Sequence, residues 1–183
     1  ETIVFGKRAG ELASQQVGES ADDGMAERAL NDALREEEAA IAALKKREDG
    51  ERQIVIRREM QDTMTAHVGV FRDEAGLSEA VERLAELRER YKAVILDSRG
   101  DVFNYDLVDT LELRGMLELA EVTALTALQR TECRGSHWRT DHLGRNDDEW
   151  LRHSLAAYNP DGEPDVTYKD VIITDYPPQE REY

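Results

Sequence analysis

The chain has 183 residues, a formal net charge of −16 at pH 7 and a mean hydropathy of −0.66. This length fits one domain, or one domain plus part of a neighbour. The 40 acidic residues are spread from end to end against 24 basic ones, which disfavours nucleic-acid binding because an acidic surface repels phosphates. No apolar run reaches the roughly 20 residues that cross a bilayer. The single Cys133 excludes an internal disulfide, so a reduced cytoplasmic setting is expected.

The basic residues divide into 19 arginines and five lysines. A diffuse acidic surface that is poor in lysine suits a protein that stays hydrated in concentrated salt, where self-repulsion is screened. We therefore predict a halophilic source, with an ordinary acidic mesophilic protein as the open alternative.

Two helices are predicted in the first 48 residues. Residues 1–17 combine small residues such as Gly6 and Gly10, which permit close packing of backbones, with the apolar run 3–5. We expect this helix to pack on something outside the chain and, since the chain opens on it without Met, we expect a piece of a longer protein. Residues 18–24 predict a polar linker, and residues 25–48 a second helix rich in Ala, Leu and Glu.

Three long amphipathic patterns follow, joined by short connections. The first runs from Gln53 to about residue 68, with apolar residues three or four apart. The second has Ser78 as its expected N-cap, and the third runs from the expected N-cap Asn104 to about residue 132. Residues 116–128 are apolar nearly all round, which indicates the central helix of the group. The predicted fold is mainly α, an antiparallel three-helix bundle with a small β-containing C-terminal tail.

The tail has its own signals. Asn146 and Glu149 resemble the capping box of a short helix. The Asn-Pro-Asp-Gly sequence at 159–162 predicts a turn between strands at 154–158 and 165–168, and residues 171–174 predict a further strand. We expect three parts in the chain, at 1–24, 25–134 and 135–183.

The segment 130–153 holds most of the residues that could carry chemistry: the only Cys, three of the four His, both Trp and five Arg. A zinc site would use Cys133, His137, His142 and His153, but their spacing lacks the paired ligands typical of zinc. A catalytic thiolate at Cys133 would need Arg134 or His137 to lower its pKa, and no oxyanion-hole pattern accompanies it. Physical chemistry favours a structural role, in which arginines bind the carbonyls of a helix end and pair with carboxylates.

The same segment resembles a known family. E-C-R-G-S-H at 132–137, Arg139 with Asp141, and R-N-D-D-E-W-L-R-H at 145–153 are similar to the E-S-R-G-A-H, R-x-D and R-D-D-x-x-[WF]-L-x-H motifs of succinate dehydrogenase and fumarate reductase flavoprotein subunits. Residues 4–11, 60–72 and 102–107 resemble further segments of that family in the same order, and the ending resembles its fumarate reductase branch. Cys133 stands where the family has Ser, and Ser136 where it has Ala.

The resemblance marks a structural motif where the bundle meets the tail. Its members are Glu132, Arg134, Gly135, His137, Arg139, Asp141, Asp147, Asp148, Trp150 and His153. It implies no catalytic, cofactor-binding or metal-binding residue in this chain, because the family's flavin-attachment His and its substrate-binding His and Arg residues belong to an earlier portion of the subunit.

By resemblance, the chain is a non-catalytic C-terminal scaffold domain of a subunit that interconverts succinate and fumarate through FAD. FAD is expected in the whole subunit and not on this chain alone. The expected partners are the subunit's own flavin domain, which would end with residues 1–24, and an iron–sulfur subunit; contact with a membrane would be only indirect, through anchor subunits. The expected location is cytoplasmic, peripheral on the inner face of the cytoplasmic membrane. The alternatives are an L-aspartate oxidase C-terminal domain, a free-standing acidic helical module that binds a basic partner, and a small zinc protein.

Overall fold

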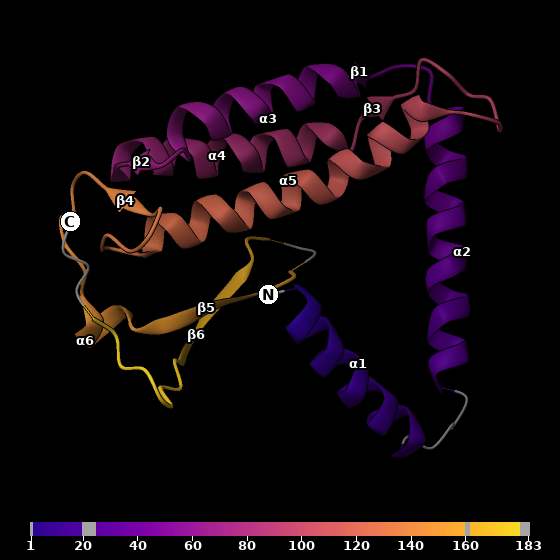
Figure 1. Ribbon diagram of the computed structural model, residues 1–183. Helices are drawn as coiled ribbons and strands as arrows, with labels where there is room; N and C mark the ends of the chain where they lie inside the picture. Colours follow the sequence, from indigo (N-terminus) through magenta and orange to yellow (C-terminus); the bar gives the residue numbers. More distant parts are fainter. Residues whose placement is uncertain (1, 20–24, 160–161, 180–183) are drawn as a thin grey trace. The chain divides into compact units, whose positions relative to one another are not determined.

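The computed structural model describes residues 2–19, 25–159 and 162–179 and divides the chain into two units, Glu1–Lys46 and Arg47–Tyr183 (Figure 1). The first unit contains α1 (Thr2–Glu19) and α2 (Met25–Lys46). Apolar side chains of α1 are exposed, among them Ile3, Phe5 and Val17. The three-part division at 24 and 134 stays a prediction.

The second unit is built on three helices that each pack on the other two: α3 (Gln53–His67), α4 (Glu74–Tyr91) and α5 (Tyr105–Gln129) (Figure 1). Apolar residues three or four positions apart on each helix close a common core. Its fully buried members include Ile56, Leu77, Leu84, Leu87, Leu113 and Leu117. The mainly α fold is therefore confirmed. Among the described helices, none is long and apolar enough to cross a bilayer.

Side-chain caps set the beginnings of α4 and α5. Asn104 Oδ1 accepts a hydrogen bond from Leu107 N at 2.9 Å, so the expected cap of α5 is confirmed. The expected cap of α4 at Ser78 is wrong, because α4 begins one turn earlier: Asp73 Oδ1 accepts from Gly76 N at 2.7 Å. The third helix ends at Gln129 rather than near residue 132, since the backbone is extended at Arg130.

Two short parallel pairings join the ends of the helices. At one end β1 (Glu51–Arg52) pairs with β3 (Val94–Ile95). At the other end β2 (Phe71–Arg72), between α3 and α4, pairs with β4 (Trp138–Arg139), which follows α5. The second pairing brings the chain after α5 back to the α3–α4 connection.

The tail contains α6 (Asp147–Trp150) and an antiparallel hairpin of β5 (Arg152–Ala157) and β6 (Asp165–Asp170). The predicted short helix and hairpin are confirmed, while two of the four predicted turn residues, 160 and 161, lie outside the described residues. The predicted strand at 171–174 is wrong. Asp170 pairs with Arg152, the first residue of β5, so no partner strand extends beside residues 171–174.

Two leucines of α5 test how the bundle is stabilised. Leu117 is 1% exposed and Leu119 is 69% exposed. We expect Leu117→Ala to lower the free energy of unfolding by about 2–5 kcal/mol, because it leaves a cavity in a packed core. Leu119→Ala is the matched control and should change it by less than about 0.5 kcal/mol. Urea unfolding followed by circular dichroism measures both, and equal effects would contradict this assignment of the core.

Candidate functional site

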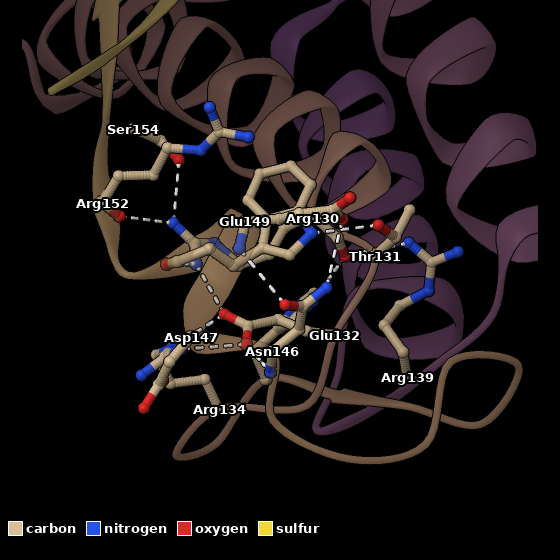
Figure 2. Close-up of polar contacts among 12 residues, drawn as sticks. Arg130, Thr131, Glu132, Arg134, Arg139, Asn146, Asp147, Glu149, Arg152 and Ser154 are labelled. Carbon is tan, nitrogen blue, oxygen red and sulfur yellow. Dashed lines mark hydrogen bonds and ion pairs between the residues drawn. The ribbon is translucent and has the colours of Figure 1, made fainter. Parts of the chain in front are cut away.

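The segment after α5 folds into a network of arginines and carboxylates, hereafter the arginine network (Figure 2). It lies where α5, the α3–α4 connection and the tail meet. Its members are Arg130, Glu132, Arg134, Arg139, Asp141 and Asp147.

Arg139 binds the C-terminal end of α5. Its side chain is 1% exposed, and its Nη1 donates to the carbonyl oxygens of Ala127 at 3.2 Å, Leu128 at 2.9 Å and Arg130 at 3.2 Å. The last carbonyls of a helix have no partner within the helix and carry partial negative charge. The buried guanidinium of Arg139 gives these carbonyls hydrogen-bond donors and also balances their partial negative charge.

The same guanidinium pairs with Asp141 through two parallel hydrogen bonds of 2.8 Å, from Nε and Nη2. Asp141 Oδ2 also accepts from Glu74 N, at the beginning of α4, at 2.7 Å. The hydrogen bonds from Arg139 hold the pKa of Asp141 well below its usual range. Arg139 and Asp141 therefore connect the end of α5 to the start of α4.

Glu132 is the buried acceptor of the arginine network, with a fully buried side chain. Oε1 accepts from Arg130 Nη1 at 2.8 Å and from Arg134 Nε at 2.7 Å. Oε2 accepts from Arg134 Nη2 at 3.0 Å and from Asn146 N at 2.8 Å. Burial alone would raise the pKa of Glu132, but the hydrogen bonds from Arg134, Asn146 and Arg130 outweigh it and lower that pKa. The buried carboxylate is therefore charged.

Around Glu132, the backbone makes a tight turn. Arg134 N donates to His137 O at 2.9 Å, and His137 N donates to Arg134 O at 3.1 Å. Gly135 has a φ of 60°, in the left-handed region that favours glycine. Arg134 also pairs with Asp147 at 2.7 Å, which lowers the pKa of Asp147 and ties the turn to α6.

His137 lies between two parts of the chain with both ring nitrogens engaged. Nδ1 lies 2.7 Å from Arg72 Nη1, and Nε2 lies 3.1 Å from Arg130 O. A guanidinium has no acceptor, so Nδ1 carries the lone pair and Nε2–H donates to the carbonyl. Burial lowers the pKa of His137, as do the charges of Arg72, Arg139 and Arg130. This imidazole is a neutral structural group.

Trp150 joins the arginine network to the hairpin. Its Nε1 donates to Thr131 Oγ1 at 3.1 Å. The guanidinium carbons of Arg130 and Arg152 lie 5.0 and 4.8 Å from the centre of its ring, within the range of cation–π attraction. Tyr168 of β6 meets Trp150 edge to face at 5.6 Å, and Arg152 also lies 4.5 Å from the Tyr168 ring.

The structure brings only some of the residues of the predicted structural motif into the arginine network. Asp148 in α6 and His153 on β5 are exposed. Conversely, Arg72, Arg130 and Asn146 belong to the arginine network or contact it, although the sequence motif did not include them. For Arg72 the signal was present in the similar stretch 60–72, and for Asn146 it was present in the capping box.

The thiol and the histidines do not form a zinc site in the part of the chain that the structure describes. Cys133 Sγ accepts from Arg139 N at 3.2 Å and lies 3.3 Å from His142 O, while the ring nitrogens of His137 contact Arg72 and Arg130. His142 instead lies near Glu74 and Asp141. That group carries no metal-site argument, because both Asp141 oxygens already accept hydrogen bonds.

Two features of the described residues bear on whether they could hold an FAD. Among them, the only buried side-chain nitrogen or oxygen without a hydrogen-bond partner is Arg152 Nε, whose guanidinium lies against the Trp150 and Tyr168 rings. A pocket beside β1 and β3, lined by residues such as Arg52 and Asp97, has a volume of about 240 Å³. This is below the roughly 300–1,000 Å³ of typical ligand pockets.

Removing the charge of Glu132 tests the arginine network. We expect Glu132→Gln to lower the free energy of unfolding by about 3–5 kcal/mol, because the partly buried guanidiniums of Arg130 and Arg134 would lose the fully buried carboxylate that they share. The matched control is Glu89→Gln, since Glu89 pairs with Lys92 at the surface and its side chain is 63% exposed; that change should cost at most about 1 kcal/mol. Chemical unfolding measures the free energy of unfolding of both variants. A loss for Glu132→Gln no larger than that of Glu89→Gln would contradict a structural role for Glu132.

The neutral state of His137 predicts acid sensitivity. Its folded pKa lies below the ordinary value of 6.5, so the unfolded chain binds the extra proton first and stability falls as the pH drops from 6.5 to the folded pKa. Histidine ring resonances in NMR give that pKa, and unfolding measured at different pH gives the loss. His137→Gln should lose less stability across this window, whereas His153→Gln, on the exposed face of β5, should keep the wild-type profile. A His137 pKa above 6.5 would refute the assigned tautomer.

Comparison with known proteins places the chain. A family model described as "Fumarate reductase flavoprotein C-term" matches residues 57–183. The fumarate reductase flavoprotein subunit of Haemophilus influenzae is 38% identical over the whole chain, which covers 30% of that subunit. The succinate dehydrogenase flavoprotein subunit of Rickettsia bellii is 40% identical over 65% of the chain and 20% of that subunit.

The fold gives the same answer. A chain of a variant Escherichia coli quinol fumarate reductase superposes with a TM-score of 0.90 at 35% identity, covering 98% of this chain and 31% of that one. The chain thus spans about a third of the length of the relatives it matches. Its sequence and its fold show that it belongs to the family of fumarate reductase and succinate dehydrogenase flavoprotein subunits, of which it corresponds to the C-terminal part.

Proposed function

We propose that this chain is the non-catalytic scaffold domain of a flavoprotein subunit that interconverts succinate and fumarate through FAD and passes the electrons to an iron–sulfur subunit. The observation that carries the proposal is the match of the entire chain to the fumarate reductase flavoprotein subunit of Haemophilus influenzae. In the succinate dehydrogenase subunit of Rickettsia bellii the match covers a smaller part of the chain, which favours the fumarate reductase branch.

The geometry of the arginine network supports a role without catalysis. Arginines that clamp a dicarboxylate need free donors, but Arg130, Arg134 and Arg139 already donate to Glu132, Asp141, Asp147 and backbone carbonyls. The thiol of Cys133 contacts the backbone, and the imidazole of His137 is held neutral between two partners. These arginines, the thiol and this imidazole are therefore engaged in holding the fold.

The proposed partners are the flavin domain of the same subunit and an iron–sulfur subunit. Two of the similar solved structures are quinol fumarate reductases, one of them with menaquinol molecules. By analogy the whole complex would lie at the inner face of the cytoplasmic membrane, and this domain would reach the membrane only through anchor subunits. The acidic surface, with a net charge of −16, fits a domain that stays away from anionic lipids.

A chimaera tests the proposal. The C-terminal part of the Haemophilus influenzae subunit that matches this chain would be replaced by the chain. We expect the chimaera to bind FAD and to catalyse succinate-dependent dye reduction, whereas the chain alone should be colourless and inactive, because it corresponds to the C-terminal part of the subunit. Flavin binding or dye reduction by the chain alone would overturn the proposal, as would a folded chimaera without activity.

A further inference from the structure

Helix α5 has two apolar faces. One packs on α3 and α4 through residues such as Leu113, Leu117 and Ala124, which are fully buried or nearly so. A second row of residues three or four apart runs along the opposite side and is here called the outer stripe. It consists of Val108, Leu111, Gly115, Leu119 and Val122. Val108 is 49% exposed and Leu119 is 69% exposed, so the second unit leaves much of the outer stripe uncovered.

The composition of the outer stripe is unusual for this protein. The chain is 35% charged, yet the outer stripe itself holds no charged residue, and Glu112 and Glu118 flank it on its two sides. Gly115 lies in the middle of a 25-residue helix, where glycine lowers helix stability relative to alanine. A Cβ added at Gly115 would meet nothing within 4 Å among the described atoms. Packing within the second unit therefore gives no reason for this glycine, whereas the close approach of another backbone would.

We propose that the outer stripe of α5 is the surface on which the flavin-binding part of the same polypeptide docks in the full-length subunit. The proposal rests on the proposed function and names the contact that it requires. The chain corresponds to 30% of the Haemophilus influenzae subunit and matches the C-terminal family model, so a full-length subunit holds a much larger preceding part. The occupant presents an apolar surface with a small residue opposite Gly115 and basic side chains near Glu112 and Glu118.

A second copy of the chain fits this surface poorly. Each copy has a net charge of −16. A two-fold contact centred on Gly115 with antiparallel helices would place Glu112 of one copy opposite Glu118 of the other, because the two positions are equally far from the centre. Like charges so placed repel each other. Electrostatics therefore favours a different occupant that contributes a cation.

The test measures access to the outer stripe by thiol alkylation. In a Cys133→Ser background, Leu119→Cys places a reporter on the outer stripe, and Glu89→Cys on α4 is the control, since the Glu89 side chain is 63% exposed. Serine is the family's usual residue at position 133. Rates are compared in the chain alone and in the chimaera, without its iron–sulfur subunit. We expect the reporter at position 119 to react about 100-fold more slowly in the chimaera, because a covered thiol reacts only through local opening, and the control to react equally in both.

A second variant identifies the contact. Gly115→Leu adds a side chain where the second unit has open space, so the chain alone should keep or raise its unfolding midpoint, because leucine favours a helix more than glycine does. In the chimaera the added side chain meets the docked part, and we expect the alkylation rate at position 119 to return toward that of the chain alone. Protection that survives Gly115→Leu would overturn the contact at this glycine.

The remaining outcomes separate the possible occupants. Protection that appears in the chain alone and grows with concentration would assign the outer stripe to a second copy and overturn the proposal. Protection that appears only after the iron–sulfur subunit is added would assign it to that subunit and also overturn it. Fast alkylation in an active chimaera would refute docking and leave the proposed function intact. A protected but inactive chimaera would support docking and count against the proposed function.

Discussion

The guanidinium of Arg139 is the constraint on which the arrangement of the second unit depends. It is 1% exposed and serves two helices at once: it donates to the last carbonyls of α5, and it pairs with Asp141, which accepts from the first turn of α4. A charge placed this deeply is stable only when its donors are satisfied in a fixed geometry. The backbone of Arg139 also pairs in β4 with Arg72 of β2, so the connection between α3 and α4 is held by the same residue.

This dependence explains how an acidic chain folds around arginines. Most carboxylates of the chain lie at the surface, but Glu132 is buried and its charge is balanced by Arg130 and Arg134. Such buried pairs add little net stability compared with apolar side chains, but an arrangement that separates their partners is strongly disfavoured. The arginine network therefore selects one path for the chain after α5. The ring of Trp150 then contacts the guanidinium groups of Arg130 and of Arg152, the first residue of the hairpin.

The sequence predicted the elements better than it predicted the contacts. The helices of the bundle, the Asn104 cap and the hairpin follow from apolar spacing, capping residues and turn signals, which are local. The prediction of Ser78 as the N-cap of α4 was wrong because Asp73, five residues earlier, also has a side chain that can cap a helix. The strand at 171–174 failed because strand formation needs a partner, and the register ends at Asp170. The role of Arg72 depends on a pairing with residues that follow more than 60 positions later, which no local pattern encodes.

The two ends of α5 are fixed by different side chains, and this has a consequence for its outer face. Asn104 accepts from the first turn, and Arg139 binds the last one, so the helix is held along its full 25 residues. Its inner face is anchored by buried residues such as Leu113 and Leu117. Rotation about the helix axis would break both the caps and the core. The opposite face is therefore presented in one orientation, and a rigid apolar surface loses little conformational entropy when a partner covers it. A helix held in this way suits the docking role proposed for its outer stripe.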